Sequence, residues 1–276
     1  MQKATYKLLN HIEDTVIYND VLPYMKAKYQ DGFATLVIPD VVAVDLNRRQ
    51  GCLKLYEGAT FNETWGHEDG GSRIDLDTAN LMINMVSDLS IIGTPIVEDI
   101  FLRGGISLDT IAFDLSRWKE SLNSGDRQQR LARRFDPSEI EQLQQIHIAG
   151  ERLFSNGDFY IRNVVRQEQK AVLVDWNYFK GFRCCYIDYR VNILAFAYIH
   201  MWGNTQWQSR LRALALERFG ISEIEFANAA VIKAVEQYLF LTNNTDICDM
   251  FCNAMVRTVK ETLAIFRERP EPGCEA

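Results

Sequence analysis

The sequence has no apolar run approaching the roughly 20 residues that a membrane-spanning helix needs. It also lacks the uninterrupted apolar centre of a signal peptide, because Lys3, Lys7, His11 and Glu13 are spread through its first residues. We therefore expect a soluble, cytoplasmic protein without a membrane partner. With 276 residues, 47% of them hydrophobic and 24% charged, the chain is not disordered and can bury a large core.

An excess of basic residues is also missing. The formal net charge of −7 argues against general binding to nucleic acid, which requires basic surface to neutralise phosphates. The one basic cluster lies among acidic residues and is typical of a solvated helix face. An acidic protein is compatible with a cationic small-molecule partner. The cluster consists of Arg127, Arg130, Arg133 and Arg134.

Cysteine patterns for metal binding are absent as well. Cys184 and Cys185 are adjacent, and Cys248 and Cys252 lie one helical turn apart with no histidine near them. No second cysteine pair has zinc spacing, so we assign no zinc site. In a chain of this size we expect the six cysteines to be buried free thiols rather than disulfides.

What the sequence does contain is a pattern of oxygen-bearing side chains at the ends of two short predicted strands. Asp158 follows a glycine within the stretch Ser155–Asn163, Asn163 comes five residues later, and Asp175 ends the apolar run that starts at Ala171. A transferring phosphoryl group asks mainly for an oriented acceptor hydroxyl and for neutralised charge. The pattern predicts that Asp158 accepts or aligns the proton of the acceptor hydroxyl. Asn163 and Asp175 are the predicted Mg²⁺ ligands, because Mg²⁺ prefers hard oxygen ligands.

The same residues carry a family resemblance. Asn-Gly-Asp-Phe-x-x-x-Asn from Asn156, followed by Val-Leu-Val-Asp-Trp from Val172, resembles the catalytic and metal-binding loops of the aminoglycoside phosphotransferase and choline kinase-like group. The resemblance implies an α+β protein-kinase-like fold with a shortened N-terminal lobe at 1–58 and a large helical lobe at 59–276. It also implies an enzyme that transfers the γ-phosphoryl group of ATP or GTP to an aminoglycoside-, amino alcohol- or sugar-like acceptor.

Five further residues receive roles from this resemblance. Lys7, in an alternating strand, is the candidate phosphate contact, with Lys3 as second choice and a solvated strand lysine as the competing interpretation. Asp14 on the following helix is the expected partner of that lysine, with Asp20 as the fallback. At the hinge, the backbone of Tyr56 and Glu57 is expected to meet the nucleotide base. Asp188 is expected to brace the catalytic loop.

Two departures from the group's pattern keep other hypotheses open. Asn156 stands where the group usually has histidine, and no glycine precedes Gly32 to form a glycine-rich turn over the phosphates. The alternative to a kinase is therefore a pseudokinase that binds nucleotide or protein without efficient transfer. A third hypothesis is that Met1 is internal to a longer gene product.

Apolar residues at steps of three and four predict helices in the second half. One helix is expected from Asp77, and another from the capping-box sequence Ser222–Glu225. Candidates for the wall of an acceptor pocket are Trp202, Trp207, Glu236, Asp246 and Asp249. The expected buried faces include Met82, Met85, Val86 and Leu89, then Ile224, Ala230, Val231, Val235, Tyr238 and Leu239, and finally Ile247, Met250, Phe251, Ala254, Met255, Thr258 and Val259.

Overall fold

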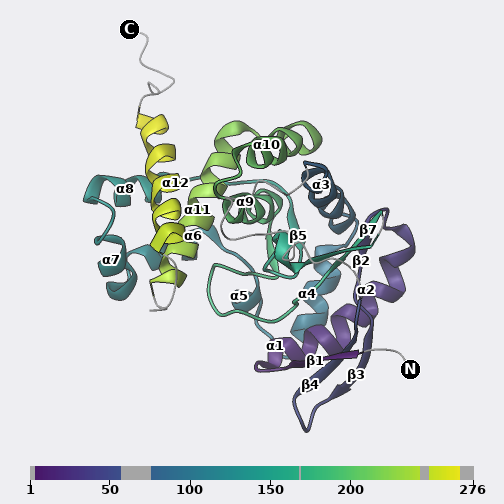
Figure 1. Ribbon diagram of the computed structural model, residues 1–276. Helices are drawn as coiled ribbons and strands as arrows, with labels where there is room; N and C mark the ends of the chain where they lie inside the picture. Colours follow the sequence, from purple (N-terminus) through teal and green to yellow (C-terminus); the bar gives the residue numbers. More distant parts are fainter. Residues whose placement is uncertain (1–3, 57–75, 168, 243–248, 268–276) are drawn as a thin grey trace.

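The computed structural model describes residues 4–56, 76–167, 169–242 and 249–267, and it combines three small sheets with a mainly helical C-terminal part (Figure 1). The expected α+β class is confirmed. Within the described residues, no helix has the length and the apolar character required to cross a membrane. The sheets and the helices that support them decide where the polar side chains of interest lie.

The first sheet is antiparallel and has the order β1-β4-β3, formed by Ala4–Leu8, Gln50–Lys54 and Val41–Asp45. One helical segment lies beside this sheet and includes the helix that was predicted to follow the first strand. It starts as α1 (Ile12–Val16), continues through the π-helical turn Ile17–Val21 and runs on as α2 (Leu22–Tyr29) into a short 3-10 turn, Gln30–Gly32. Its apolar side chains enter the core, where Tyr18 and Met25 are fully buried.

The second sheet joins distant parts of the chain. β2 (Leu36–Val37) pairs in parallel with β7 (Lys170–Leu173), which pairs antiparallel with β6 (Val164–Gln167). β2 is anchored by the buried carboxylate of Asp88, which accepts the backbone N–H groups of residues 34, 35 and 36 at 3.0, 2.7 and 2.6 Å. The expected lobe boundary near residue 58 lies outside the described residues and remains a proposal.

The third sheet pairs β5 (Arg152–Phe154) with β8 (Ile187–Tyr189) in antiparallel fashion. The helices of the C-terminal part surround it, and α11 and α12 lie at the end of the molecule opposite the β1-β4-β3 sheet (Figure 1). These helices are α3 (Asp77–Leu89), α4 (Thr94–Arg103), α5 (Leu108–Ile111), α6 (Leu115–Leu122), α7 (Gly125–Leu131), α8 (Pro137–Gln145), α9 (Arg190–His200), α10 (Thr205–Phe219), α11 (Glu223–Leu241) and α12 (Asp249–Arg267).

The helix predictions are confirmed in their centres and wrong at two ends. The stripe Met82, Met85, Val86 and Leu89 of α3 is buried, and Ser222 and Glu225 form the expected capping box of α11. Ile224 and Met250, expected inside, are 46% and 64% exposed. Each is the second residue of its helix, where few neighbours define the buried face. Ile247 lies outside the described residues.

The prediction of a solvated arginine face on α7 is wrong for its first two members. Arg127 forms an ion pair with Glu236, and Arg130 is 9% exposed and donates to the carbonyl of Leu239 at 2.7 Å. Glu236 also accepts from the indole of Trp118 at 2.8 Å. These contacts fix α11 against α6 and α7, so Glu236 belongs to the core. Trp207, another candidate for the pocket wall, is fully buried.

Candidate functional site

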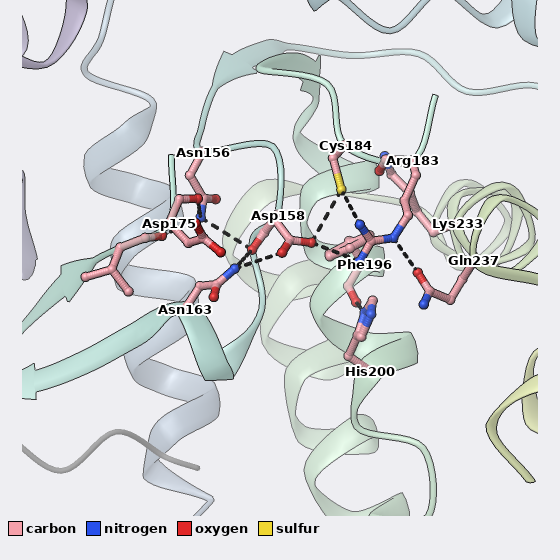
Figure 2. Close-up of polar contacts among 11 residues, drawn as sticks. Asn156, Asp158, Asn163, Asp175, Arg183, Cys184, Phe196, His200, Lys233 and Gln237 are labelled. Carbon is pink, nitrogen blue, oxygen red and sulfur yellow. Dashed lines mark hydrogen bonds and ion pairs between the residues drawn. The ribbon is translucent and has the colours of Figure 1, made fainter. Parts of the chain in front are cut away.

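The β6-β7 hairpin brings the three predicted oxygen-bearing side chains together. Val164 pairs with Leu173, so Asn163 and Asp175 flank the same end of the hairpin, and the N–H of Val174 donates to the carbonyl of Asn163 at 2.8 Å. The Nδ2 of Asn163 donates to the carbonyl and to Oδ2 of Asp158 at 2.8 and 2.9 Å. Figure 2 shows Asp158, Asn163 and Asp175 gathered on one side of the hairpin end.

Asn156 ties the two loops of the site to each other. Its side chain is fully buried, and Nδ2 lies 2.9 Å from the carbonyl of Val174, 3.3 Å from that of Asp175 and 3.4 Å from that of Asp158. One amide group therefore contacts the backbone on both sides of the site (Figure 2). The position at which the resemblance leads one to expect histidine thus has a supporting role with a different side chain.

Gly157 lets the loop pass close to another segment. Its φ is +73°, and a Cβ there would lie 3.2 Å from backbone atoms of Cys184. An alanine in the left-handed region costs about 1–2 kcal/mol. We expect Gly157→Ala to lower the free energy of unfolding by more than that, because its Cβ would also clash with the backbone of Cys184, and urea denaturation measures the loss. Gly220→Ala is the matched control, since φ is +64° there and nothing lies within 4 Å of the added Cβ. Equal losses in both variants would contradict the close approach.

The carboxylate of Asp158 is almost fully enclosed, at 4% exposure. Oδ1 lies 3.2 Å from Nη2 of Arg183 and 3.4 Å from Sγ of Cys184, while Oδ2 accepts from Asn163. Burial raises the pKa of Asp158, and the neighbouring guanidinium of Arg183 opposes that rise. Burial and the charge of Asp158 raise the pKa of Cys184, so this thiol stays protonated and donates. A carboxylate with these three donors retains one further lone-pair direction for a ligand.

Arg183 is the residue of this site that sequence reasoning missed. It lies in the loop that joins β7 to β8, where no motif or spacing points to it. Its ion pair with Asp158 spans 25 residues, and it forms because the loop that carries Arg183 packs on the Ser155–Asn163 loop. The only signal in the sequence was its place between Asp175 and Asp188.

Asp175 and Lys7 form an ion pair at 3.0 Å, with side chains 28% and 32% exposed. Lys7 lies in β1 opposite Gly51 of β4, so the pair links the first sheet to the hairpin loop. Asp175 has φ +59°, in the left-handed region that costs a residue with a side chain about 1–2 kcal/mol. Such strain is typical of functional positions that their surroundings fix.

The expected pairing of Lys7 with Asp14 is not the one in the structure. Asp14 is 1% exposed, and its carboxylate accepts the N–H of His11 at 2.9 Å and that of Tyr178 at 2.5 Å. It therefore caps α1 and fixes that helix to the loop after Asp175. Lys7 pairs with Asp175 instead because β1 passes over that loop. The fallback acid, Asp20, is exposed and accepts from the neighbouring Asn19, and Lys3 lies outside the described residues.

The hinge prediction falls partly outside the described residues, since Glu57 is not among them. Tyr56 is half-buried, and its hydroxyl accepts the N–H of Asp40 at 2.8 Å and donates to the carboxylate of Asp40 at 3.0 Å. These bonds fix the end of β4 to the start of β3. Burial raises the pKa of Tyr56, so the hydroxyl stays protonated at neutral pH.

Asp188 forms a buried ion pair. Its carboxylate accepts from Nζ of Lys233 at 2.6 Å and from Nδ2 of Asn192 at 2.7 Å, and both charged side chains are 2% exposed. Lys233 also donates to the carbonyl of Arg183 at 3.2 Å. Asp188 therefore supports the segment that carries Arg183, through Lys233. Its side chain was expected to brace the Ser155–Asn163 loop directly.

His200 makes the stability of this region depend on pH. Burial, followed by the charges of Arg183, Arg162 and Lys233, lowers the pKa of His200 to about 3, so the folded ring is neutral. The unfolded ring binds a proton below about pH 6.5. Stability should therefore fall as pH drops from about 6.5 towards 3, by up to about 1.4 kcal/mol per pH unit. Urea denaturation of His200→Gln should show a flatter slope, and an unchanged slope would contradict this origin.

The residues present fit Mg²⁺. The donor set offers the amide oxygen of Asn163 and the carboxylate of Asp175, both hard ligands, and leaves the remaining positions to waters and phosphate oxygens. Because Nδ2 of Asn163 donates to Asp158, Oδ1 of the same amide is left for other partners. Among the described residues, no group of three or more histidine, cysteine or acidic side chains is arranged to hold a metal alone. A metal held by Asn163 and Asp175 would take its remaining ligands from water or from a bound anion.

Comparisons of the whole chain with known proteins place this geometry in a known fold. No family model matches the chain, and no curated protein matches it. A choline/ethanolamine kinase family protein from Mesorhizobium loti is 14% identical with a TM-score of 0.57, covering 97% of this chain and 83% of that one. The GDP and kanamycin complex of APH(2")-IIia is 9% identical with a TM-score of 0.59, covering 95% and 87%. Ethanolamine kinase from Plasmodium vivax is 10% identical with a TM-score of 0.59, covering 97% and 77%.

The chain has a protein-kinase-like fold. The similarity runs along nearly the whole chain and includes both parts of the molecule, so the fold implied by the sequence resemblance is confirmed. The structural neighbours named above are described as kinases or phosphotransferases of small molecules. Within this fold, Asp158, Asn163 and Asp175 lie together at one end of the β6-β7 hairpin.

Proposed function

We propose that this protein transfers the γ-phosphoryl group of ATP or GTP to a hydroxyl group of a small molecule. The observation that carries the proposal is the cluster of Asp158, Asn163 and Asp175 at one hairpin end, with Lys7 bonded to Asp175. The kinase-like fold supports it, as do neighbours solved with GDP. A nucleotide placed here would meet a cation, two metal ligands and a carboxylate within one cluster.

Each residue then has a defined task. The acceptor oxygen bonds to the γ-phosphorus as the bond to the β–γ bridging oxygen breaks, the nucleoside diphosphate leaves, and the hydroxyl proton passes to Asp158. Lys7 contacts the α- and β-phosphates, and Tyr56 with Glu57 presents backbone groups to the base. Asn163 and Asp175 would hold Mg²⁺, which when bound neutralises phosphate charge.

A pseudokinase that binds nucleotide or protein without efficient transfer is the second candidate. The observation that favours it is the enclosure of Asp158, whose carboxylate is 4% exposed and already has Arg183 as a partner. A carboxylate in that state accepts a substrate proton only if the acceptor reaches its remaining lone pair. The two candidates therefore differ in turnover rather than in nucleotide affinity.

The test measures nucleotide binding and nucleoside diphosphate release separately. Binding of Mg·ATP and Mg·GTP is measured by calorimetry, and diphosphate release is measured with and without amino alcohols, sugars, hydroxy acids and aminoglycosides. Release that depends on an acceptor establishes the transferase. Nucleotide binding without release on any acceptor supports the pseudokinase. Absence of nucleotide binding contradicts the transferase and leaves only the protein-binding form of the second candidate.

A further inference from the structure

Arg183 places a cation directly beside the carboxylate that the acceptor hydroxyl must approach. Its Nη2 lies 3.2 Å from Oδ1 of Asp158, and its side chain is 14% exposed (Figure 2). Any acceptor whose hydroxyl reaches Asp158 therefore brings its neighbouring atoms close to a guanidinium. This position sets a condition on the chemistry of the acceptor.

The guanidinium is fixed from several sides. Nε donates to Oε1 of Gln237 at 2.7 Å, and Nη1 donates to Sγ of Cys184 at 3.0 Å. The charge also lies over the rings of Phe240 and Phe196, with centroids 4.4 and 5.4 Å away. A cation held by this many partners loses little further freedom when it binds a ligand, so it is preorganised.

The contacts leave part of the donor capacity of Arg183 unused. A guanidinium carries five N–H groups. Within the described residues it donates three side-chain hydrogen bonds, to Asp158, Cys184 and Gln237, which use one N–H on each nitrogen. One N–H on each terminal nitrogen remains. Sγ of Cys184 and Oδ1 of Asp158 lie 3.4 Å apart, so they take the two parallel N–H groups at the end of the guanidinium, and the two that remain point to opposite sides of it. Each can donate a single charged hydrogen bond to an oxygen of a carboxylate or of a phosphate.

Two further cations act on the same region as Arg183. Arg183, Arg162 and Lys233 all act on His200, which packs 4.3 Å from the Phe196 ring that also lies under Arg183. Lys233 is paired with Asp188 and Arg183 with Asp158, so the cationic groups still open to a ligand are the N–H groups of Arg183 that point away from Asp158. A cationic acceptor would meet repulsion here, which an anionic one would not.

We propose that the acceptor is a small hydroxylated anion, whose carboxylate or phosphate group binds Arg183 while its hydroxyl faces Asp158. This inference rests on the proposed phosphoryl transfer and makes its acceptor class specific. It differs from the cationic acceptor that the acidic composition permitted. Arg183 selects the acceptor, and Asp158 receives the proton.

The experiment compares acceptors that share a primary hydroxyl and differ in the group beyond it. The probes are 1,3-propanediol, 3-amino-1-propanol, 3-hydroxypropanoate and 3-hydroxypropyl phosphate, each with Mg·ATP and Mg·GTP. Diphosphate release is measured for the wild type, Arg183→Gln and Arg183→Lys. Arg257→Gln is the control, because it removes the same charge from a side chain 65% exposed on α12.

We expect kcat/KM to be highest with the two anionic probes, and their relative rates to distinguish carboxylate from phosphate. Arg183→Gln should lower kcat/KM about tenfold to a hundredfold for the anions and less for propanediol, as expected for a lost charged hydrogen bond. Arg183→Lys should recover part of the loss, and Arg257→Gln should change nothing. Faster transfer to propanediol or to the amine would overturn this inference and leave the transferase intact.

If no probe is phosphorylated, binding of the anionic probes tests the proposed anion site at Arg183. Saturation-transfer NMR of the anionic probes is then measured with the protein and a non-hydrolysable Mg·ATP analogue. Binding to the wild type and to Arg257→Gln that is lost in Arg183→Gln supports the anion site independently of turnover. Absence of binding to the wild type, or equal binding to Arg183→Gln, overturns it.

Discussion

Asp158→Asn is expected to lower acceptor-dependent phosphoryl transfer by about 10²- to 10⁴-fold, the usual contribution of a positioned general base. The amide keeps the size of the side chain and one oxygen for Asn163 or Arg183, but it cannot take up the proton of the acceptor hydroxyl. Nucleotide affinity should change little, because the contacts proposed for the nucleotide come from Lys7, Asn163 and Asp175. Initial rates of diphosphate release with a turned-over acceptor check this result.

The control for that variant is Asp99→Asn. Asp99 lies on α4 with a side chain 63% exposed and forms only a surface ion pair with Arg103. It removes the same charge without touching the site, so its transfer rate should equal that of the wild type. Thermal unfolding of both variants checks that they fold. A folded Asp158→Asn protein with the wild-type rate would remove Asp158 from the mechanism.

Lys233→Met is expected to lower the free energy of unfolding by about 3–5 kcal/mol, the cost of leaving a buried charge without its partner. Lys233 and Asp188 are each 2% exposed and 2.6 Å apart, so the carboxylate that remains has no access to solvent. Chemical denaturation at neutral pH measures the loss.

Two further variants isolate the buried pair. Asp188→Asn combined with Lys233→Met removes both charges and should recover a large part of the stability. Lys260→Met breaks the ion pair of Lys260 with Glu139, in which the lysine side chain is 44% exposed, and should cost at most about 1 kcal/mol. A loss for Lys233→Met no larger than that for Lys260→Met would contradict the structural role of the Asp188 pair.

Local signals predicted the parts of the fold that depend on a few neighbouring residues. The capping box of Ser222 with Glu225 and the buried stripe of α3 follow from contacts within one or two helical turns, and the structure confirms both. The same periodic reasoning is wrong for Ile224 and Met250, each in the first turn of its helix. The prediction of a solvated face is also wrong for Arg127 and Arg130. It rested on the charges of neighbouring residues, which do not show that a distant acid such as Glu236 lies opposite Arg127 in the folded protein.

The site divides in the same way. The order and spacing of Asp158, Asn163 and Asp175 are properties of a loop and a hairpin only 18 residues long, so the sequence by itself was enough to place them together. Other contacts in and around the site join residues that lie far apart in the chain. Asp175 pairs with Lys7 across 168 residues, Asp14 bonds to Tyr178 across 164, and Asp188 pairs with Lys233 across 45.

The sequence by itself therefore predicted the oxygen cluster of the candidate site, because its residues lie close together in the chain, and it indicated the class of fold through the family resemblance that the same residues carry. Only the tertiary structure decided which charge stands beside Asp158, which acid Lys7 meets and what Asn156 supports. An ion pair depends on where two side chains lie in space, and folding brings Arg183 to Asp158, 25 residues away, and to Gln237, 54 residues away, without any spacing rule between them.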